Sequence, residues 1–169
     1  MSHERAQALP HESVASVSVQ ANRQGRSVPG GLRLHEYVNL YMTARNPMLN
    51  LLVRSRLTSL CVVEVDGAVM DIPGVVVTDQ NAARTAVRFM PAPDGLEHIE
   101  EADVFRGYWT HADPEEEYRR KGAKCAEVLV PHHVPRDQLR RILVGCPRAA
   151  SAAAGAGPPV ATDRHLFFQ

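Results

Sequence analysis

The sequence lacks the features that mark membrane proteins and disulfide-rich secreted proteins. No apolar run reaches the roughly 18 residues that cross a bilayer, and residues 1–12 have no apolar core typical of a secretory signal. The three cysteines, Cys61, Cys125 and Cys146, are widely spaced and form no CxxC pair, which argues against a disulfide framework or a zinc cluster. We therefore expect a protein of the reducing cytoplasm that has no membrane segment, with Cys61 and Cys125 as small core residues.

Common catalytic signatures are missing as well. The chain contains no GxGxxG, GxxxxGK[ST], HExxH or GxSxG motif, which removes the usual signs of dinucleotide folds, phosphate loops, zinc proteases and serine hydrolases. The adjacent His132 and His133 have no second ligand pair at a zinc-like spacing, so we interpret them as loop residues and expect no metal. Tyr37, Tyr41 and Trp109 could stack on bases, although packing in the core is the more common role of such residues.

Charge is balanced overall but unevenly distributed. The 19 basic and 19 acidic residues cancel, yet residues 13–63 hold six arginines against one acid. Residues 64–117 hold thirteen acids against three arginines, and residues 118–169 hold nine basic residues against three acids. Two basic segments that met in the fold would form a positive cleft for a polyanion, whereas the alternative is that each block is a solvated face.

Hydrophobic periodicity and turn residues predict the secondary structure. Residues 14–26 are compatible with a helix or with an alternating strand, and SVPGG at 27–31 is a turn. A short helical segment is predicted over 135–141. Longer helices are predicted over 80–89, capped by Asp79, and from Pro114 onward, capped by Asp113. Strands are predicted over 37–42, 60–65, 75–78, 126–131 and 142–144.

These elements define the expected domain organisation. Residues 1–12 carry no periodicity and are interpreted as an irregular N-terminus, while 13–148 hold a single α+β domain with a mixed, split sheet around one cleft. Residues 149–162 are rich in Ala, Gly and Pro and are expected to be flexible. Residues 163–169 contain HLFF and are expected to return as a C-terminal edge strand.

Glu127 is the strongest catalytic candidate that the residues themselves offer. It begins the otherwise apolar AEVLVP segment, and a carboxylate beside a buried strand is costly unless it is paired or functional. The alternative is a partly exposed glutamate that pairs with Lys124 or with an arginine.

Four stretches in order resemble the DarT family of toxin–antitoxin ADP-ribosyltransferases: LHEYVNLYMTARNPML, DIPGVVVTDQNAA, RFMPAPDGL and KCAEVLVP. The resemblance runs from about Val14 to Val144. It implies an ADP-ribosyltransferase-like split β-fold and a transfer of ADP-ribose from NAD onto thymidine or guanosine in single-stranded DNA. It also implies a macrodomain antitoxin as partner. The alternative is a truncated or degenerate, catalytically inactive remnant that still binds DNA.

The resemblance also assigns residues. The family's catalytic glutamate falls on Glu127 and its catalytic arginine falls on Arg23, with Arg26 as the fallback. Residues of the chain that become candidates for binding NAD are Tyr41, Arg45 and Met48. Residues that become candidates for binding DNA are Arg26, Trp109, His111 and Lys124, of which Trp109 and His111 lie on the connection over 86–126 that corresponds to the family's substrate-recognition loop.

The resemblance is incomplete at the N-terminus. Members of the family carry a His-Thr element that grips NAD upstream of the region around Val14, and nothing in residues 1–12 matches it. Asn22 also stands where a second arginine is expected beside Arg23. We therefore expect residues 1–169 by themselves to bind NAD weakly and to turn over slowly or not at all, even with Glu127 and Arg23 in place.

Overall fold

The computed structural model describes residues 1–11 and 13–169, and it divides into two compact units. Unit 1 consists of Met1–Thr43 and Ala68–Val134, and unit 2 consists of Ala44–Gly67 and Pro135–Gln169. Each unit is therefore built from two separate stretches of the chain. Glu12, the last residue of the expected irregular N-terminus, lies outside the described residues.

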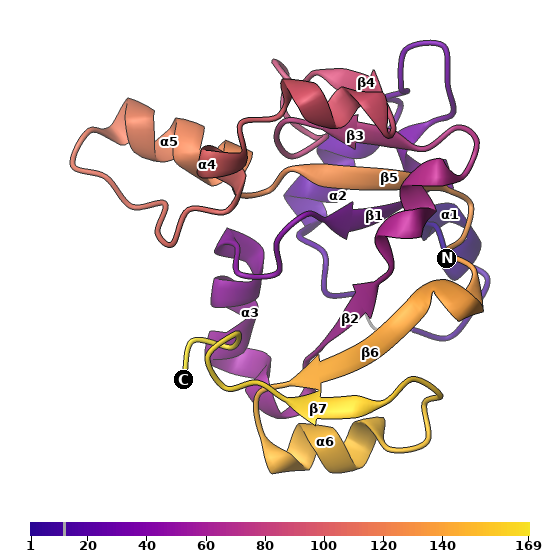
Figure 1. Cartoon of the computed structure of the whole chain (residues 1–169), viewed down its shortest axis with the longest axis vertical. Coiled ribbons are helices and arrows are strands. Elements are labelled where there is room, and N and C mark those ends of the chain that lie inside the picture. Colours follow the sequence, from indigo (N-terminus) through magenta and orange to yellow (C-terminus); the bar gives the residue numbers. More distant parts are fainter. Residues whose placement is uncertain (12) are drawn as a thin grey trace. The chain divides into compact units, whose positions relative to one another are not determined.

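Unit 1 is organised around a four-stranded antiparallel sheet in the order β1-β5-β3-β4 (Figure 1). The strands are β1 (Tyr37–Tyr41), β5 (Glu127–Pro131), β3 (Val76–Thr78) and β4 (Phe89–Pro91). Strand β5 is almost wholly buried because it has a partner strand on each side. That position explains its continuous apolar sequence, EVLV, and makes the glutamate at its start stand out.

The register of the strands places Glu127 on the same sheet face as the main apolar cluster. Tyr41 and Thr78 stand opposite Glu127, and Leu129 follows two residues later on that face. The core cluster of unit 1 contains Val28, Leu34, Tyr37, Val76, Ala82 and Leu129. The carboxylate thus lies at one end of a packed, water-poor surface.

The helices of unit 1 are short. The α-helices are α1 (His3–Ala6), α2 (Val17–Arg23), α4 (Glu101–Val104) and α5 (Pro114–Ala123). The 3-10 turns are η1 (Leu34–Glu36), η3 (Gly67–Asp71) and η4 (Asp94–His98). The first residue of η3, Gly67, is the last residue of a unit 2 stretch. Helix α5 begins as the sequence predicts, because Asp113 accepts a hydrogen bond from the Glu115 N–H and Pro114 occupies the first turn. Residues 14–26 form a helix rather than a strand.

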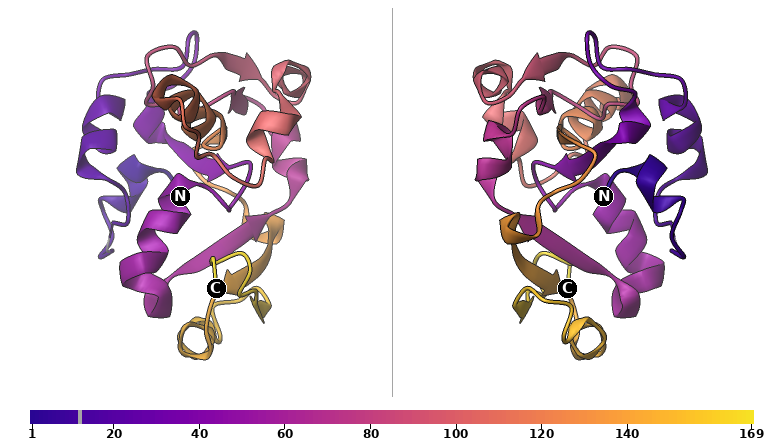
Figure 2. Two further views of the ribbon diagram at one scale, coloured as in Figure 1. Left: turned by 90° about the vertical axis from the view of Figure 1, so that its left-hand side faces the viewer. Right: turned by 90° about the vertical axis from the view of Figure 1, so that its right-hand side faces the viewer.

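Unit 2 contains a three-stranded mixed sheet in the order β2-β6-β7. Strands β2 (Cys61–Val65) and β6 (Leu139–Val144) are antiparallel, and β7 (Val160–Thr162) runs parallel to β6. Its helices are α3 (Pro47–Arg56) and α6 (Pro147–Ala153), with 3-10 turns η2 (Leu57–Ser59) and η5 (Arg136–Gln138). Helix α6 packs beside β7, as Figures 1 and 2 show. The larger core cluster of unit 2 consists of Leu49, Leu60, Leu143 and Phe167.

Both sheets and their short helices agree with the expected α+β class, but several predicted elements are wrong. No helix spans 80–89, because Asp79 accepts hydrogen bonds from the Arg88 N–H and Nε and closes a loop before β4. Helix α3 was not predicted at all. Its signal is Asn46 followed by Pro47, because Asn46 caps the helix by accepting from the Leu49 N–H at 2.9 Å.

The expectations for both chain ends also need correction. Residues 3–6 form α1 instead of irregular chain, and the short C-terminal strand is β7 at Val160–Thr162. Residues 163–169 form turns in which Phe167 is fully buried, so HLFF supplies an apolar anchor and not a strand. Helix α6 occupies part of the segment expected to be flexible. Within the described residues, no helix is both long and apolar enough to traverse a bilayer.

Cys61 was expected in the core, but it is exposed. Strand β2 is the edge of its sheet, and Cys61 and Val63 lie on a face of that strand that packing leaves open. Cys125 is half-buried, and burial raises the pKa of its thiol to about 12.

Candidate functional site

The fold brings together the two catalytic candidates, Arg23 and Glu127. Nη2 of Arg23 donates to both carboxylate oxygens of Glu127, at 2.6 Å to Oε1 and 2.7 Å to Oε2, although the residues are 104 positions apart. Both side chains are buried, with relative exposures of 4% and 1%. The ion pair settles which arginine faces the glutamate, because the fallback Arg26 makes no such contact among the described residues.

Local structure explains why the side chains of Arg23 and Glu127 lie in contact. Arg23 is the last residue of α2, so its long side chain leaves the helix where the chain turns toward Gly25, which has a positive φ of 76°. Glu127 is the first residue of β5 and is fixed there by its own backbone. Its N–H donates to Thr78 Oγ1 at 3.1 Å, and the Thr78 hydroxyl in turn donates to the Gln80 carbonyl.

Asn39 is a further residue of the site that sequence reasoning missed. Its Nδ2 donates to Glu127 Oε2 at 3.0 Å across the β1–β5 pair. Asn39 stands opposite Leu129, so it is the diagonal neighbour of Glu127 on the same sheet face. Because Asn39 is exposed and Glu127 is not, the amide lies at the boundary between the carboxylate and solvent. A polar residue inside the YVNLY strand is the only signal that the sequence offered.

Opposing effects act on the pKa of Glu127. Burial raises the pKa above its usual range, because the charged form loses its hydration. The charge and hydrogen bonds of Arg23, together with the Asn39 amide and the Ala82 backbone N–H, oppose that rise. The nearby Tyr41 hydroxyl is driven strongly toward its neutral form, since burial and the Glu127 charge both raise its pKa. The site is therefore a buried carboxylate whose charge depends on specific donors.

A cavity of about 510 Å³ opens beside Arg23 within unit 1. Its walls come from α1, α2 and the residues around η1, and its polar side chains are mainly basic or amide groups. The lining residues are His3, Gln7, Val17, Gln20, Ala21, Arg23, Gln24, Gly25, Arg33 and His35. Nothing in the sequence had linked Gln20 or His35 to the site.

The candidates for DNA binding differ in burial and in the contacts that they make. Arg26 is half-buried one turn beyond Arg23. Lys124 is 2% exposed, and its Nζ donates to the Val104 carbonyl at 3.0 Å, so the structure does not fit the expected contact between this ammonium and a phosphate. The lysine instead ties the start of β5 to α4. Trp109 is half-buried and His111 is exposed on the segment that precedes α5.

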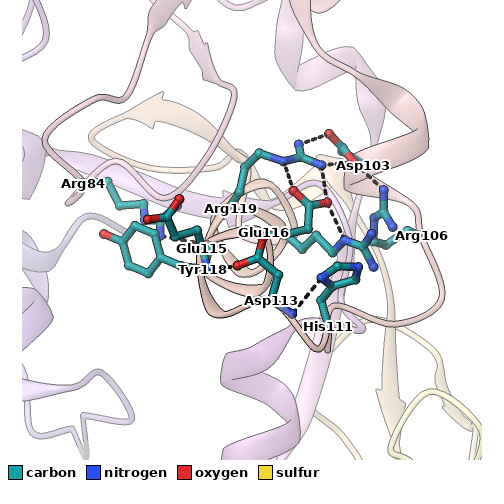
Figure 3. Close-up of polar contacts among 10 residues, drawn as sticks. Arg84, Asp103, Arg106, His111, Asp113, Glu115, Glu116, Tyr118 and Arg119 are labelled. Carbon is teal, nitrogen blue, oxygen red and sulfur yellow. Dashed lines mark hydrogen bonds and ion pairs between the residues drawn. The ribbon is translucent and has the colours of Figure 1, made fainter.

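An ion-pair network fixes the helices next to that segment (Figure 3). Asp103 of α4 pairs with Arg106 at 2.6 Å and also with Arg119 of α5, and Arg119 contacts Glu116 at 2.8 Å. Arg119 and Arg120 lower the pKa of Glu116 to about 2, so this carboxylate is charged over the whole working range of pH. The His111 ring accepts from the Asp113 N–H at 3.1 Å, which joins His111 to the cap of α5.

The candidates for NAD binding fall in both units. Tyr41 ends β1 in unit 1, directly opposite Glu127. Arg45 and Met48 belong to unit 2, where Arg45 lies over the Phe168 ring at 4.4 Å and donates to the His165 carbonyl. Within residues 1–11 and 13–169, no three His, Cys, Asp or Glu side chains are grouped to hold a metal ion.

One protein-family model matches nearly the whole chain. It covers residues 1–168 and is described as ssDNA thymidine ADP-ribosyltransferase, DarT. The match is wider than the stretch from Val14 to Val144 over which the resemblance was expected, and it includes the N-terminal residues. No curated protein is similar enough to count as a match.

Solved structures with the same fold include a Thermosipho africanus DarTG in complex with ADP-ribose, at 27% identity and a TM-score of 0.81. The match covers 99% of this chain but only 46% of that chain, so this chain spans less than half of that relative. A Thermus sp. 2.9 DarT in complex with ADP-ribosylated ssDNA matches at 24% identity and a TM-score of 0.79, over 98% and 85% of the two chains. The same Thermus protein in complex with carba-NAD+ matches at 20% identity, a TM-score of 0.77 and coverages of 98% and 87%.

Proposed function

The chain belongs to the DarT family of ssDNA thymidine ADP-ribosyltransferases, and from that membership we propose that it transfers ADP-ribose from NAD to a base of single-stranded DNA. Thymidine is the base that the family description names, and guanosine is the alternative. The observation that supports this proposal most directly is the buried contact of 2.6 Å between Arg23 and Glu127.

The chemistry requires a carboxylate at the reacting ribose. The bond between the anomeric carbon and the nicotinamide nitrogen breaks, nicotinamide leaves with the bonding electrons, and the base nitrogen forms the new bond to the same carbon. Positive charge develops on the ribose in this transition state, and a nearby carboxylate stabilises that charge. We assign this role to Glu127, whose dry surroundings strengthen the interaction.

Arg23 has two roles in the proposal. Without substrate, it neutralises Glu127 and contacts both carboxylate oxygens, whereas Asn39 contacts Oε2 alone. Withdrawal of the guanidinium would therefore leave Oε2 held by Asn39 while Arg23 becomes available to the base or to a phosphate. The base also loses a proton when it attacks, and Glu127 is the acceptor that we propose for it.

The proposal extends to location and partner. Since chromosomal DNA is the proposed acceptor, we place the activity in the cytoplasm. The relative from Thermosipho africanus is a DarTG, and we propose that this chain likewise acts as the toxin of a toxin–antitoxin pair restrained by a macrodomain antitoxin.

The test is a mass measurement on single-stranded oligonucleotides incubated with NAD and the protein. We expect a gain of one ADP-ribosyl group with the parent chain and none with Glu127→Gln, which keeps the shape of the side chain but removes its charge. Glu64→Gln is the matched control, because Glu64 is an exposed carboxylate of unit 2 that pairs with Arg141.

The outcomes separate the two hypotheses for the chain. Full activity in Glu127→Gln would refute the assignment of the catalytic carboxylate. DNA binding by the parent chain without any transfer would instead favour the alternative, a remnant that keeps the DNA site without chemistry.

A further inference from the structure

Arg84 is a half-buried arginine that pairs with no carboxylate in the part of the chain that the structure describes. It lies on the loop over 79–88, between β3 and β4. Its Nη1 donates to Gln80 Oε1 of the same loop at 2.8 Å, and its Nη2 donates to the Tyr118 carbonyl of α5 at 2.9 Å. The guanidinium also lies over the Tyr118 ring, 3.7 Å from the ring centre (Figure 3). These contacts fasten the loop to α5.

The docking of this guanidinium depends on Gly122. Gly122 is buried within α5, where glycine is less favourable than alanine. A Cβ at this position would overlap Arg84 Nη1 and would lie 2.9 Å from Gln80 Oε1, so a larger residue would displace the guanidinium. The helix therefore has a poor helix-forming residue at the place where Arg84 docks.

The loop that Arg84 fastens also carries groups that fix Glu127. The Gln80 carbonyl accepts from the Thr78 hydroxyl at 2.7 Å, and the same hydroxyl oxygen accepts from the Glu127 N–H at 3.1 Å. Two residues beyond Gln80, the backbone N–H of Ala82 faces the Glu127 carboxylate and favours its charged form. Ala82 is fully buried, so its place beside the carboxylate follows from the path of the loop.

We propose that Arg84 is a positioning residue for Glu127. By fastening the loop over 79–88 to α5, its guanidinium holds the Ala82 N–H against the Glu127 carboxylate. The contacts of Arg84 within the described residues are with Gln80 and Tyr118, so it acts on the carboxylate through the loop. The inference rests on the proposed function, in which charged Glu127 stabilises the reacting ribose.

A second explanation is that Arg84 acts on Glu127 only through its charge. Two variants separate the two explanations. Arg84→Met removes both the charge and the contacts with α5. Gly122→Ala keeps the charge, but its methyl group occupies the place where the guanidinium docks. Because alanine favours a helix more than glycine does, Gly122→Ala should not weaken α5 itself.

The experiment is a pH titration of the Glu127 side-chain carboxyl in the full chain, followed by carbon-13 nuclear magnetic resonance. Displacement of the Ala82 donor disfavours the charged form. Both variants should therefore raise the pKa of Glu127 by about one pH unit, the equivalent of one hydrogen bond. Both variants leave unaltered the charged and titratable side chains near this carboxylate, which are Arg23, Tyr41 and Cys125.

Arg148→Met is the matched control, because Arg148 is an exposed arginine on α6 of unit 2. A raised pKa of Glu127 in Gly122→Ala, with none in the control, supports the proposal even if Arg84→Met fails to fold. A rise in Arg84→Met alone would mean that Arg84 acts by its charge, and this result would overturn the proposal. An unshifted pKa in both variants would overturn it as well.

The titration does not depend on turnover, so it distinguishes this inference from the proposed function. A raised pKa of Glu127 in both variants of a chain that transfers no ADP-ribose would support the positioning role and refute the proposed function. Transfer to DNA with an unshifted pKa in both variants would do the reverse. Where transfer occurs, the acid limb of the pH–activity profile should move up together with the pKa, which a loss of stability alone would not cause.

Discussion

At the scale of the residue, the Arg23–Glu127 pair couples the proposed chemistry to stability. Arg23→Met should cost about 3–5 kcal/mol of unfolding free energy at neutral pH, because it leaves a buried carboxylate without its counter-charge. Adding Glu127→Gln should recover most of that loss, since no buried charge then remains. Urea unfolding of the single and double variants measures both values. A double variant no more stable than Arg23→Met would contradict the expectation.

The pH dependence of the same variant has a definite sign. In Arg23→Met, burial raises the pKa of Glu127 without opposition from the guanidinium. A carboxyl whose pKa is higher in the folded state favours folding while it is protonated, and that contribution is lost as pH rises through the raised pKa. The destabilisation should therefore be smaller in mildly acidic buffer than at neutral pH.

Asn39 should act as a positioning residue for the carboxylate. Asn39→Leu removes the donor to Glu127 Oε2, which disfavours the charged form and raises the pKa of Glu127 further. If the reaction needs ionised Glu127, the acid limb of the pH–activity profile should move up by about one pH unit, the equivalent of one such hydrogen bond. Asn22→Leu, which removes an exposed amide of α2, serves as the control. An unshifted limb in Asn39→Leu would show that the Asn39 amide does not tune the carboxylate.

At the scale of the element, the cap of α5 is the clearest local determinant. Asp113 Oδ1 accepts from the Glu115 N–H at 3.0 Å, so Asp113→Ala should cost about 1 kcal/mol in unfolding free energy. Glu115→Ala removes a first-turn acid of the same helix without removing the cap, and it should cost only a few tenths of that amount. Equal losses in chemical denaturation would mean that the charge, not the cap, stabilises this end.

Strands were predicted more successfully than helices, for reasons visible in particular residues. The buried strand β5 and its partner β1 carry short apolar and aromatic runs of strand length, so their length and their β-favouring residues identified them. The helix predicted over 80–89 failed because the Asp79 side chain caps a loop nine residues long through Arg88. An aspartate such as Asp79 can accept from the first N–H groups of a helix or from an N–H group of a loop. The sequence does not show which of these N–H groups the fold brings to it.

The candidate site was only partly predictable. Glu127 was conspicuous as a charge in an apolar strand, and Arg23 was singled out only through resemblance to a family, without any expectation that the two side chains pair. Asn39 was missed because its contact with Glu127 depends on strand register, which is not a property of local sequence. Gln20 and His35 were missed because only the fold brings them to the cavity beside Arg23. Lys124 was a candidate for DNA binding through the resemblance, whereas the fold buries its side chain and its Nζ donates to the Val104 carbonyl.

At the scale of the whole molecule, the segregation of charge should matter more than its sum. The net charge is zero, yet the acidic residues concentrate in 64–117 and leave both flanking regions basic. We expect single-stranded DNA to bind with an affinity that falls as salt rises, with a log–log slope of about 0.7 for each phosphate contacted. Fluorescence anisotropy across a salt series measures that slope, and an affinity independent of salt would argue against phosphate contacts.

The separation of 104 residues between Arg23 and Glu127 also has a consequence during synthesis. At ribosomal speeds of about 5–20 residues per second, roughly 5–20 seconds pass between the appearance of the arginine and that of the glutamate. In that interval the nascent chain contains Arg23 but not yet Glu127. It also contains β1 and β3 but not yet β5, the strand that pairs with both of them. Any message cut short before the codon for Glu127 therefore yields a product that holds Arg23 but lacks the proposed catalytic carboxylate.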